Sequence, residues 1–185
     1  MSTVSRREFL TRGWGAKAGA SEEARNLRWV RPPFARPEVD FLRLCTKCTD
    51  CADACSHDVI FRLSASVGDM AQGTPALDLL NRGCHLCDGF PCVGACETGA
   101  LGFPETDSAP LPRPNLATCE VSAEACFAYD GPECGACADS CPVPGALTWL
   151  DATKPRINPA LCIGCALCRE ACIVSPKAIS VKPGV

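Results

Sequence analysis

The chain has few of the residues that build an ordinary hydrophobic core. Leu, Ile, Val and Phe account for 39 of its 185 residues, with only one Tyr, two Met and three Trp. That share, about 21%, lies close to the limit below which chains bury too little apolar surface to fold. We therefore expect something other than aliphatic packing to hold the protein together. Apolar runs of the roughly 20 residues needed to cross a bilayer are also missing, so we predict no membrane span.

The motifs and charges of several functional classes are missing as well. The sequence contains neither a GxGxxG dinucleotide fingerprint nor a Walker motif. Its two histidines, His57 and His85, adjoin cysteine motifs, and we expect them on the surface or behind metal ligands rather than acting as acids and bases. Residues 45–185 carry nine Lys and Arg against 16 Asp and Glu, a net of −7, which argues against nucleic-acid binding. We predict that the protein is not an enzyme and binds no nucleic acid.

What the chain has in abundance is cysteine, with 17 residues. The pattern CxxCxxCxxxC occurs twice, at Cys45, Cys48, Cys51 and Cys55 and again at Cys162, Cys165, Cys168 and Cys172. Three thiolates so close together curl around a compact object such as an iron–sulfur cubane, whereas a zinc site prefers two CxxC knuckles far apart in sequence. Disulfides fit poorly, because CxxC neighbours strain a bridge and the total is odd. The spacing therefore predicts [4Fe-4S] clusters.

Two further cysteine groups keep the pattern but lengthen one of its loops. They are Cys84, Cys87, Cys92 and Cys96, and Cys126, Cys134, Cys137 and Cys141. Loop closure becomes less favourable only slowly with length, so both insertions are compatible with cluster binding. Four groups of four leave Cys119 over. Cys119 is an alternative to Cys126 as a ligand, but it would need a long excursion to Cys134, and we expect it to be a small apolar residue or a free thiol.

The four groups mark an internal repeat. Their first cysteines fall at positions 45, 84, 126 and 162, and a short apolar run follows each group. These runs predict strands at 59–61, 100–103, 146–149 and 178–181. The repeating unit is a cluster-binding loop, a one-turn helix and a short strand, which together predict an α+β fold.

A known ligation rule assigns the cysteines to clusters. In bacterial two-cluster ferredoxins the fourth cysteine of one motif ligates the other cluster. Applied here, the rule gives four [4Fe-4S] clusters held by Cys45, Cys48, Cys51 and Cys96; Cys84, Cys87, Cys92 and Cys55; Cys126, Cys134, Cys137 and Cys172; and Cys162, Cys165, Cys168 and Cys141. The motifs then form two tandem bacterial-type two-cluster ferredoxin modules, over 41–104 and 115–185, with a Pro-rich linker at 105–114.

A basic arm over residues 1–40 precedes the modules. Its hexapeptide SRREFL, at 5–10, is similar to a twin-arginine export signal. Such a signal also needs an apolar stretch of about seven to 15 residues, and here charged residues interrupt every run that follows. We expect the arm to be retained and the protein to be cytoplasmic; the alternative is a periplasmic protein exported by the twin-arginine route.

Three segments carry a family resemblance. The NapF-type ferredoxins resemble this chain in its arm, in residues 31–45 and above all in the stretch 125–141. Residues 82–101 instead resemble the second cysteine motif of the NapG and MauM type. The NapF resemblance implies a cytoplasmic accessory protein that contacts the catalytic subunit of periplasmic nitrate reductase and assists its maturation. The NapG and MauM resemblance implies the alternative, an electron-transfer subunit between quinol and a periplasmic reductase.

Overall fold

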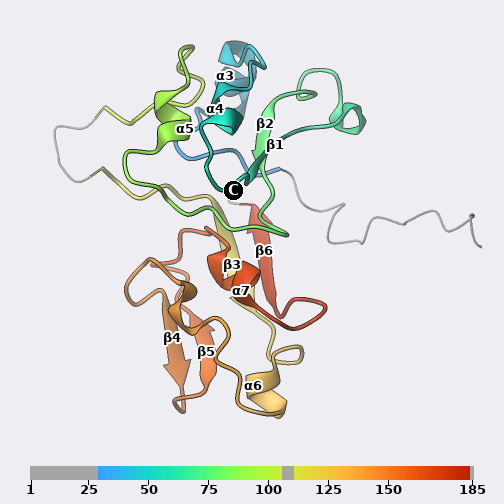
Figure 1. Ribbon diagram of the computed structural model, residues 1–185, viewed down its shortest axis with the longest axis vertical. Coiled ribbons are helices and arrows are strands. Elements are labelled where there is room, and N and C mark those ends of the chain that lie inside the picture. The colour runs from blue at the N-terminus through green and yellow to red at the C-terminus, as the bar shows by residue number, and fades with distance from the viewer. Residues whose placement is uncertain (1–28, 106–110, 184–185) are drawn as a thin grey trace, which may run out of the picture.

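The computed structural model describes residues 29–105 and 111–183, and Figure 1 shows their elements in two groups, one above the other. The SRREFL hexapeptide, the rest of residues 1–28, and residues 106–110 of the expected linker lie outside the described residues. Among the helices that are described, none is long and apolar enough to cross a membrane.

The upper group in Figure 1 is built from residues 29–105. Its elements are α3 (Glu38–Leu44), α4 (Asp50–Asp53), β1 (Ile60–Arg62), the 3-10 helix η1 (Ala65–Val67), β2 (Pro75–Leu77) and α5 (Pro91–Gly94). β1 and β2 pair antiparallel, with Ile60 opposite Leu77, and Val30 adds an isolated bridge to Leu77. The sheet is therefore a short hairpin extended at one point by the entering chain.

The lower group is built from residues 111–183. Its elements are β3 (Ala117–Val121), α6 (Phe127–Asp130), η2 (Ala138–Ser140), β4 (Leu147–Leu150), β5 (Lys154–Ile157), α7 (Leu167–Ala171) and β6 (Ile179–Pro183). β4 and β5 form a hairpin, whereas β3 pairs antiparallel with β6, so the first and last strands of this group close on each other.

The α+β class and most of the predicted elements are confirmed. A one-turn helix precedes the fourth cysteine of every motif, and strands are found at three of the four expected places. The strand expected at 100–103 is wrong, because only Leu101 bridges to Ala35 there. Prolines flank both segments, at Pro37 and Pro104 among others, and a residue without an N–H group cannot extend the ladder.

Arg31 anchors the segment that leads into the first cysteine loop. Its guanidinium pairs with the Glu38 carboxylate at 2.6 Å, donates to the Pro75 carbonyl at 2.6 Å, and lies 4.4 Å from the centroid of the buried Phe41 ring. The hydrogen bond from Arg31 lowers the pKa of Glu38 below its usual value. Because α3 ends directly before Cys45, these contacts fix where the first loop begins.

The two groups share one core. Buried residues from Val30 to Val181 form a single continuous cluster. Across the junction the Cys84 N–H donates to the Cys165 carbonyl at 2.7 Å, and the Gly83 N–H donates to the Glu170 carboxylate at 2.8 Å. The buried Arg169 donates from Nε to the Leu80 carbonyl at 3.0 Å and from another nitrogen to a β6 carbonyl. The second cysteine loop is therefore seated on α7.

Gly164 tests the packing of the fourth cysteine loop against β3 within the lower group, because a Cβ added there would lie 2.0 Å from the carbonyl oxygen of Ala117. Gly99 is a matched control, since its φ of +70° is close to the +71° of Gly164 but its surroundings are open. We expect Gly99→Ala to lower the free energy of unfolding by about 1–2 kcal/mol, from the left-handed backbone alone. Gly164→Ala should lower it by at least about 3 kcal/mol or prevent folding. Anaerobic urea unfolding followed by circular dichroism measures both, and equal losses would contradict the packing.

Candidate metal centres

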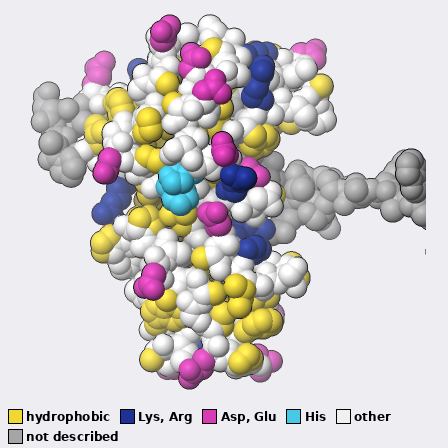
Figure 2. Space-filling view, viewed as in Figure 1, with side chains coloured by type: hydrophobic (Ala, Val, Ile, Leu, Met, Phe, Trp, Pro, Cys, Tyr) yellow, Lys and Arg dark blue, Asp and Glu magenta, His cyan; other side chains and the backbone are white. Residues whose placement is uncertain are grey.

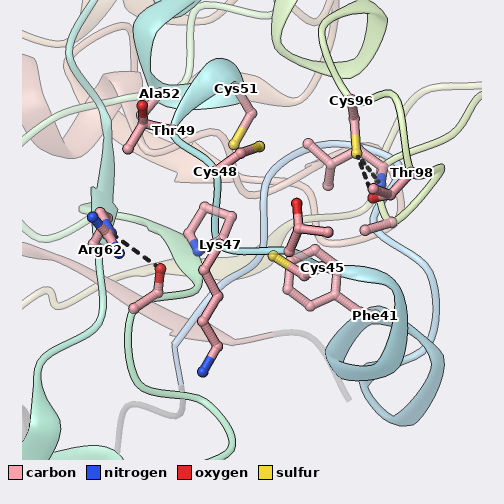
Figure 3. Close-up of a pocket in the computed structure, with 15 residues that line it drawn as sticks. Phe41, Cys45, Lys47, Cys48, Thr49, Cys51, Ala52, Arg62, Cys96 and Thr98 are labelled. Carbon is pink, nitrogen blue, oxygen red and sulfur yellow. Dashed lines mark hydrogen bonds between the residues drawn. The ribbon is translucent and has the colours of Figure 1, made fainter.

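Cavity one lies between the first cysteine loop and the segment after α5. The cysteines that line it are Cys45, Cys48, Cys51 and Cys96. Figure 3 shows that three of them come from one loop and Cys96 from a separate segment. The Cys96 sulfur accepts a hydrogen bond from the Leu101 N–H at 3.3 Å, and the cationic side chains of Lys47 and Arg62 belong to the lining. Cys48 is exposed, so cavity one opens to solvent.

Cavity two lies beside β1 and contains the complementary set of cysteines. They are Cys55, Cys84, Cys87 and Cys92. His57 and His85 line the same cavity and stack in parallel, with ring centroids 3.5 Å apart and planes 4° apart. Their side chains form one patch on the face shown in Figure 2. The histidines therefore cover cavity two toward the solvent, which agrees with the surface position expected for them.

Cavity three lies in the lower group, against β3 and β4. Its cysteines are Cys119, Cys141, Cys162, Cys165 and Cys168. Four of these are a predicted ligand set, and Cys119 is a fifth thiol beside them. The rest of the lining is apolar, from residues such as Val143 and Ile163.

The fourth predicted ligand set, which is Cys126, Cys134, Cys137 and Cys172, is only partly brought together in the structure. Cys126 packs against Cys172, and both are close enough for their charges to act on Cys137. Cys134 instead lines an open cavity with Trp149 and Thr153. Cys134 follows Cys126 after a seven-residue loop, the longest spacing within the four motifs.

A repeated backbone feature shapes the loops of the three cavities. The residue before the second cysteine of each of these three motifs is left-handed, namely Lys47 (φ 62°), Leu86 (φ 51°) and Gly164 (φ 71°). This conformation is unfavourable for residues with a Cβ and is found where a site requires it. It turns successive N–H groups inward, and the N–H groups of Leu86 and Gly164 donate to the sulfurs of Cys84 and Cys162. The loops are therefore shaped to stabilise thiolates.

Burial favours the protonated thiols as long as no metal is bound. It raises the pKa of Cys51 and Cys84 to about 11 and that of Cys92 and Cys165 to about 12. Metal ligation needs thiolates, so loading releases protons and becomes more favourable as the pH rises. In the described part of the chain no three His, Cys, Asp or Glu side chains converge closely enough for one metal ion. Four separated thiols around a cavity fit a larger cluster better than they fit zinc.

Sequence reasoning missed that Cys119 lies in a cavity. Hydrogen bonding with Cys162 raises the pKa of Cys119, and the same interaction lowers the pKa of Cys162 to about 6. The signal was the alternation over 117–121, which places Ala117 and Cys119 on the buried face of one strand. We predicted strands only from the apolar runs that follow the cysteine motifs, so we did not use the alternation over 117–121.

Cavities of thiol donors, bounded by short loops and one-turn helices, define a ferredoxin-type iron–sulfur protein. The methylamine utilization ferredoxin-type protein MauM of Methylorubrum extorquens is 30% identical over 203 residues, which cover 97% of this chain and 89% of that protein. The ferredoxin-type protein NapF of Escherichia coli is 30% identical over 175 residues, covering 93% and 92%. The ferredoxin-type protein NapG of Escherichia coli is 29% identical over 165 residues, which cover 83% of this chain and 70% of that protein. The chain belongs to the family of ferredoxin-type proteins that includes MauM, NapG and NapF.

The family resemblance expected from residues 31–45, 82–101 and 125–141 is thereby confirmed. No protein-family model matches the chain, and no solved structure matches it.

Cys96 provides a test of the ligand sets, because it lies in the second motif but lines cavity one. We expect Cys96→Ala to remove the cluster of cavity one, lowering bound iron by about four atoms per chain and sulfide in parallel. Thr98→Val is the control, since Thr98 lines the same cavity and its hydroxyl oxygen lies 3.7 Å from the Cys96 sulfur. Iron and acid-labile sulfide are measured on anaerobically purified protein. Full iron in Cys96→Ala would contradict the assignment.

Proposed function

We propose that the protein holds four [4Fe-4S] clusters and acts as a ferredoxin-type accessory protein in the maturation of the catalytic subunit of a periplasmic nitrate reductase. The observation that supports it most strongly is that each of three cavities is lined by four motif cysteines, three from one motif and one from another, with Cys119 as a fifth thiol in cavity three. That exchange of fourth cysteines follows the ligation rule of two-cluster ferredoxins. The fourth cluster, on Cys126, Cys134, Cys137 and Cys172, rests on the cysteine spacing and on the three that lie together.

Each cluster supplies a site that takes up and gives back one electron. The residues of the chain hold the thiolates, donate N–H groups to their sulfurs and exclude water. Cavity one has an exposed cysteine, Cys48, whereas Cys165 and Cys168 of cavity three are buried. Electron exchange with a partner is therefore more direct at cavity one than at cavity three.

The accessory role and its partner rest on the NapF resemblance. The match to NapF extends over nearly the whole of both chains. The charges that interrupt the segment after SRREFL favour retention of the arm in the cytoplasm, where an unexported reductase subunit would be met. A retained arm with a net positive charge is suited to contact an acidic partner surface.

A second candidate function has its own support. The match to MauM covers 97% of this chain, and the arm carries the arginine pair of a twin-arginine signal. In this alternative the protein is periplasmic and relays electrons from quinol toward a reductase. Both candidates need the same clusters and differ in compartment and partner.

Iron content is the first test of the proposal. Anaerobically purified protein should contain about 16 iron atoms and about as many acid-labile sulfides per chain, because each cubane carries about four of each. About 12 would mean that the loop bearing Cys134 does not complete a site. Zinc in place of iron, or iron without sulfide, would overturn the proposal.

The identity of the protein that binds this chain distinguishes the accessory role from the electron relay. We expect the protein, tagged at its C-terminus and captured from the cytosolic fraction, to bring down the unexported catalytic subunit of the reductase. Replacing Arg6 and Arg7 together by Gln should weaken that capture while leaving iron content unchanged. A shortened periplasmic form that is oxidised by a reductase and captures no precursor would favour the relay and contradict the accessory role.

A further inference from the structure

Cys119 occupies a fixed position on β3. The burial of β3 alternates, with Ala117 and Cys119 inward and Thr118 and Glu120 outward, and only 2% of Cys119 is exposed. Cys119 lies opposite Val181 in a five-residue antiparallel ladder with β6. Its backbone is therefore held by the sheet, unlike the loops and short helices that carry the other cysteines of cavity three.

The thiol of Cys119 shares cavity three with a complete predicted ligand set. That set is Cys141, Cys162, Cys165 and Cys168. Cys119 lines this cavity together with Cys162 and Cys168, so its thiol faces the same space as their sulfurs. A cubane takes one thiolate for each of its four irons, so one of the five thiols in this cavity would be left without an iron to bind.

The three cavities differ in the other side chains around their cysteines. Cavity one has Lys47 and Arg62 in its lining, and cavity two has His57 and His85. The lining of cavity three, within the described residues, has only apolar side chains besides its cysteines. The S–H of Cys119 is thus the side-chain donor available to a cluster in cavity three.

We propose that Cys119 is a non-ligating thiol that donates an S–H···S hydrogen bond to the cluster of cavity three and raises its reduction potential. This inference rests on the proposed function, because it requires a cluster on Cys141, Cys162, Cys165 and Cys168. Reduction adds negative charge to the cluster, and hydrogen bonds to its sulfurs stabilise that charge. In an apolar cavity the effect of one donor is weakly screened and therefore large.

Cys119→Val is the direct test, since valine fills a similar volume without a donor. We expect wild-type iron and sulfide content, and a lower midpoint potential for one of the four clusters in an anaerobic titration monitored by electron paramagnetic resonance. Cys119→Ser keeps a donor and should retain a potential closer to wild type. Val181→Ala is the matched control, because it perturbs the same sheet opposite Cys119 and leaves the thiol in place.

A second measurement detects the donor proton itself. After reconstitution of the unsubstituted protein in D2O, the reduced cluster of cavity three should lose the hyperfine couplings of its exchangeable protons, including that of the Gly164 N–H. One of these couplings, that of the Cys119 S–H, should also be missing in Cys119→Ala prepared in ordinary water, while the others remain.

Each contrary result has its own signature. Four unchanged potentials in Cys119→Val, with every exchangeable-proton coupling retained in Cys119→Ala, would overturn the hydrogen bond. Loss of about four irons in folded Cys119→Val would show that Cys119 is itself a ligand. Wild-type protein that lacks the iron of this cavity before any substitution would overturn the proposed function, and the inference with it.

Discussion

The structure depends on bringing thiols from two motifs around one cavity. In cavity one, Cys96 meets a loop whose last cysteine is Cys51, and in cavity two, Cys55 meets a loop that begins at Cys84. In the function that we propose, a cluster in each cavity would tie these distant segments together through bonds far stronger than apolar contacts. Metal binding of this kind supplies folding free energy, because the site does not exist in the unfolded chain. This explains how a chain with so few large aliphatic residues, and with sheets of only two strands, adopts a defined fold.

The remaining contacts position the loops. Arg31 holds the chain that enters the first loop, and Arg169 holds α7 against the segment that enters the second. Both guanidinium groups are largely buried and satisfied by carbonyl or carboxylate oxygens. Left-handed residues such as Lys47 and Leu86 then turn each loop inward at the cost of local strain. The packing thus places the thiols, and the proposed clusters would hold the packing together.

Cysteine spacing grouped the thiols that line the three cavities better than it predicted the strands, because ligand spacing is local in the sequence and apolar packing is not. The one-turn helices and the strand after Cys141 could be predicted, since both recur in phase with the cysteines. The seating of Gly83 against Leu167 could not be predicted, because it depends on contact between residues more than 80 positions apart. β3 does not recur with the cysteine repeat, so its local alternation over 117–121 was not used. It is stabilised by pairing with β6, and its place beside cavity three gives Cys119 a role that its isolated position in the sequence did not indicate.

Amide hydrogen exchange before and after anaerobic removal of iron and sulfide tests most directly whether the clusters hold the fold together. With the clusters bound, the amides of β3, β6 and α7 should be protected. After removal by a chelator under reducing conditions, that protection should be lost in all three elements together, and restoring iron and sulfide should bring it back. Unchanged protection in the cluster-free protein would show that ordinary packing is sufficient, and would contradict the central role of the cysteine sets.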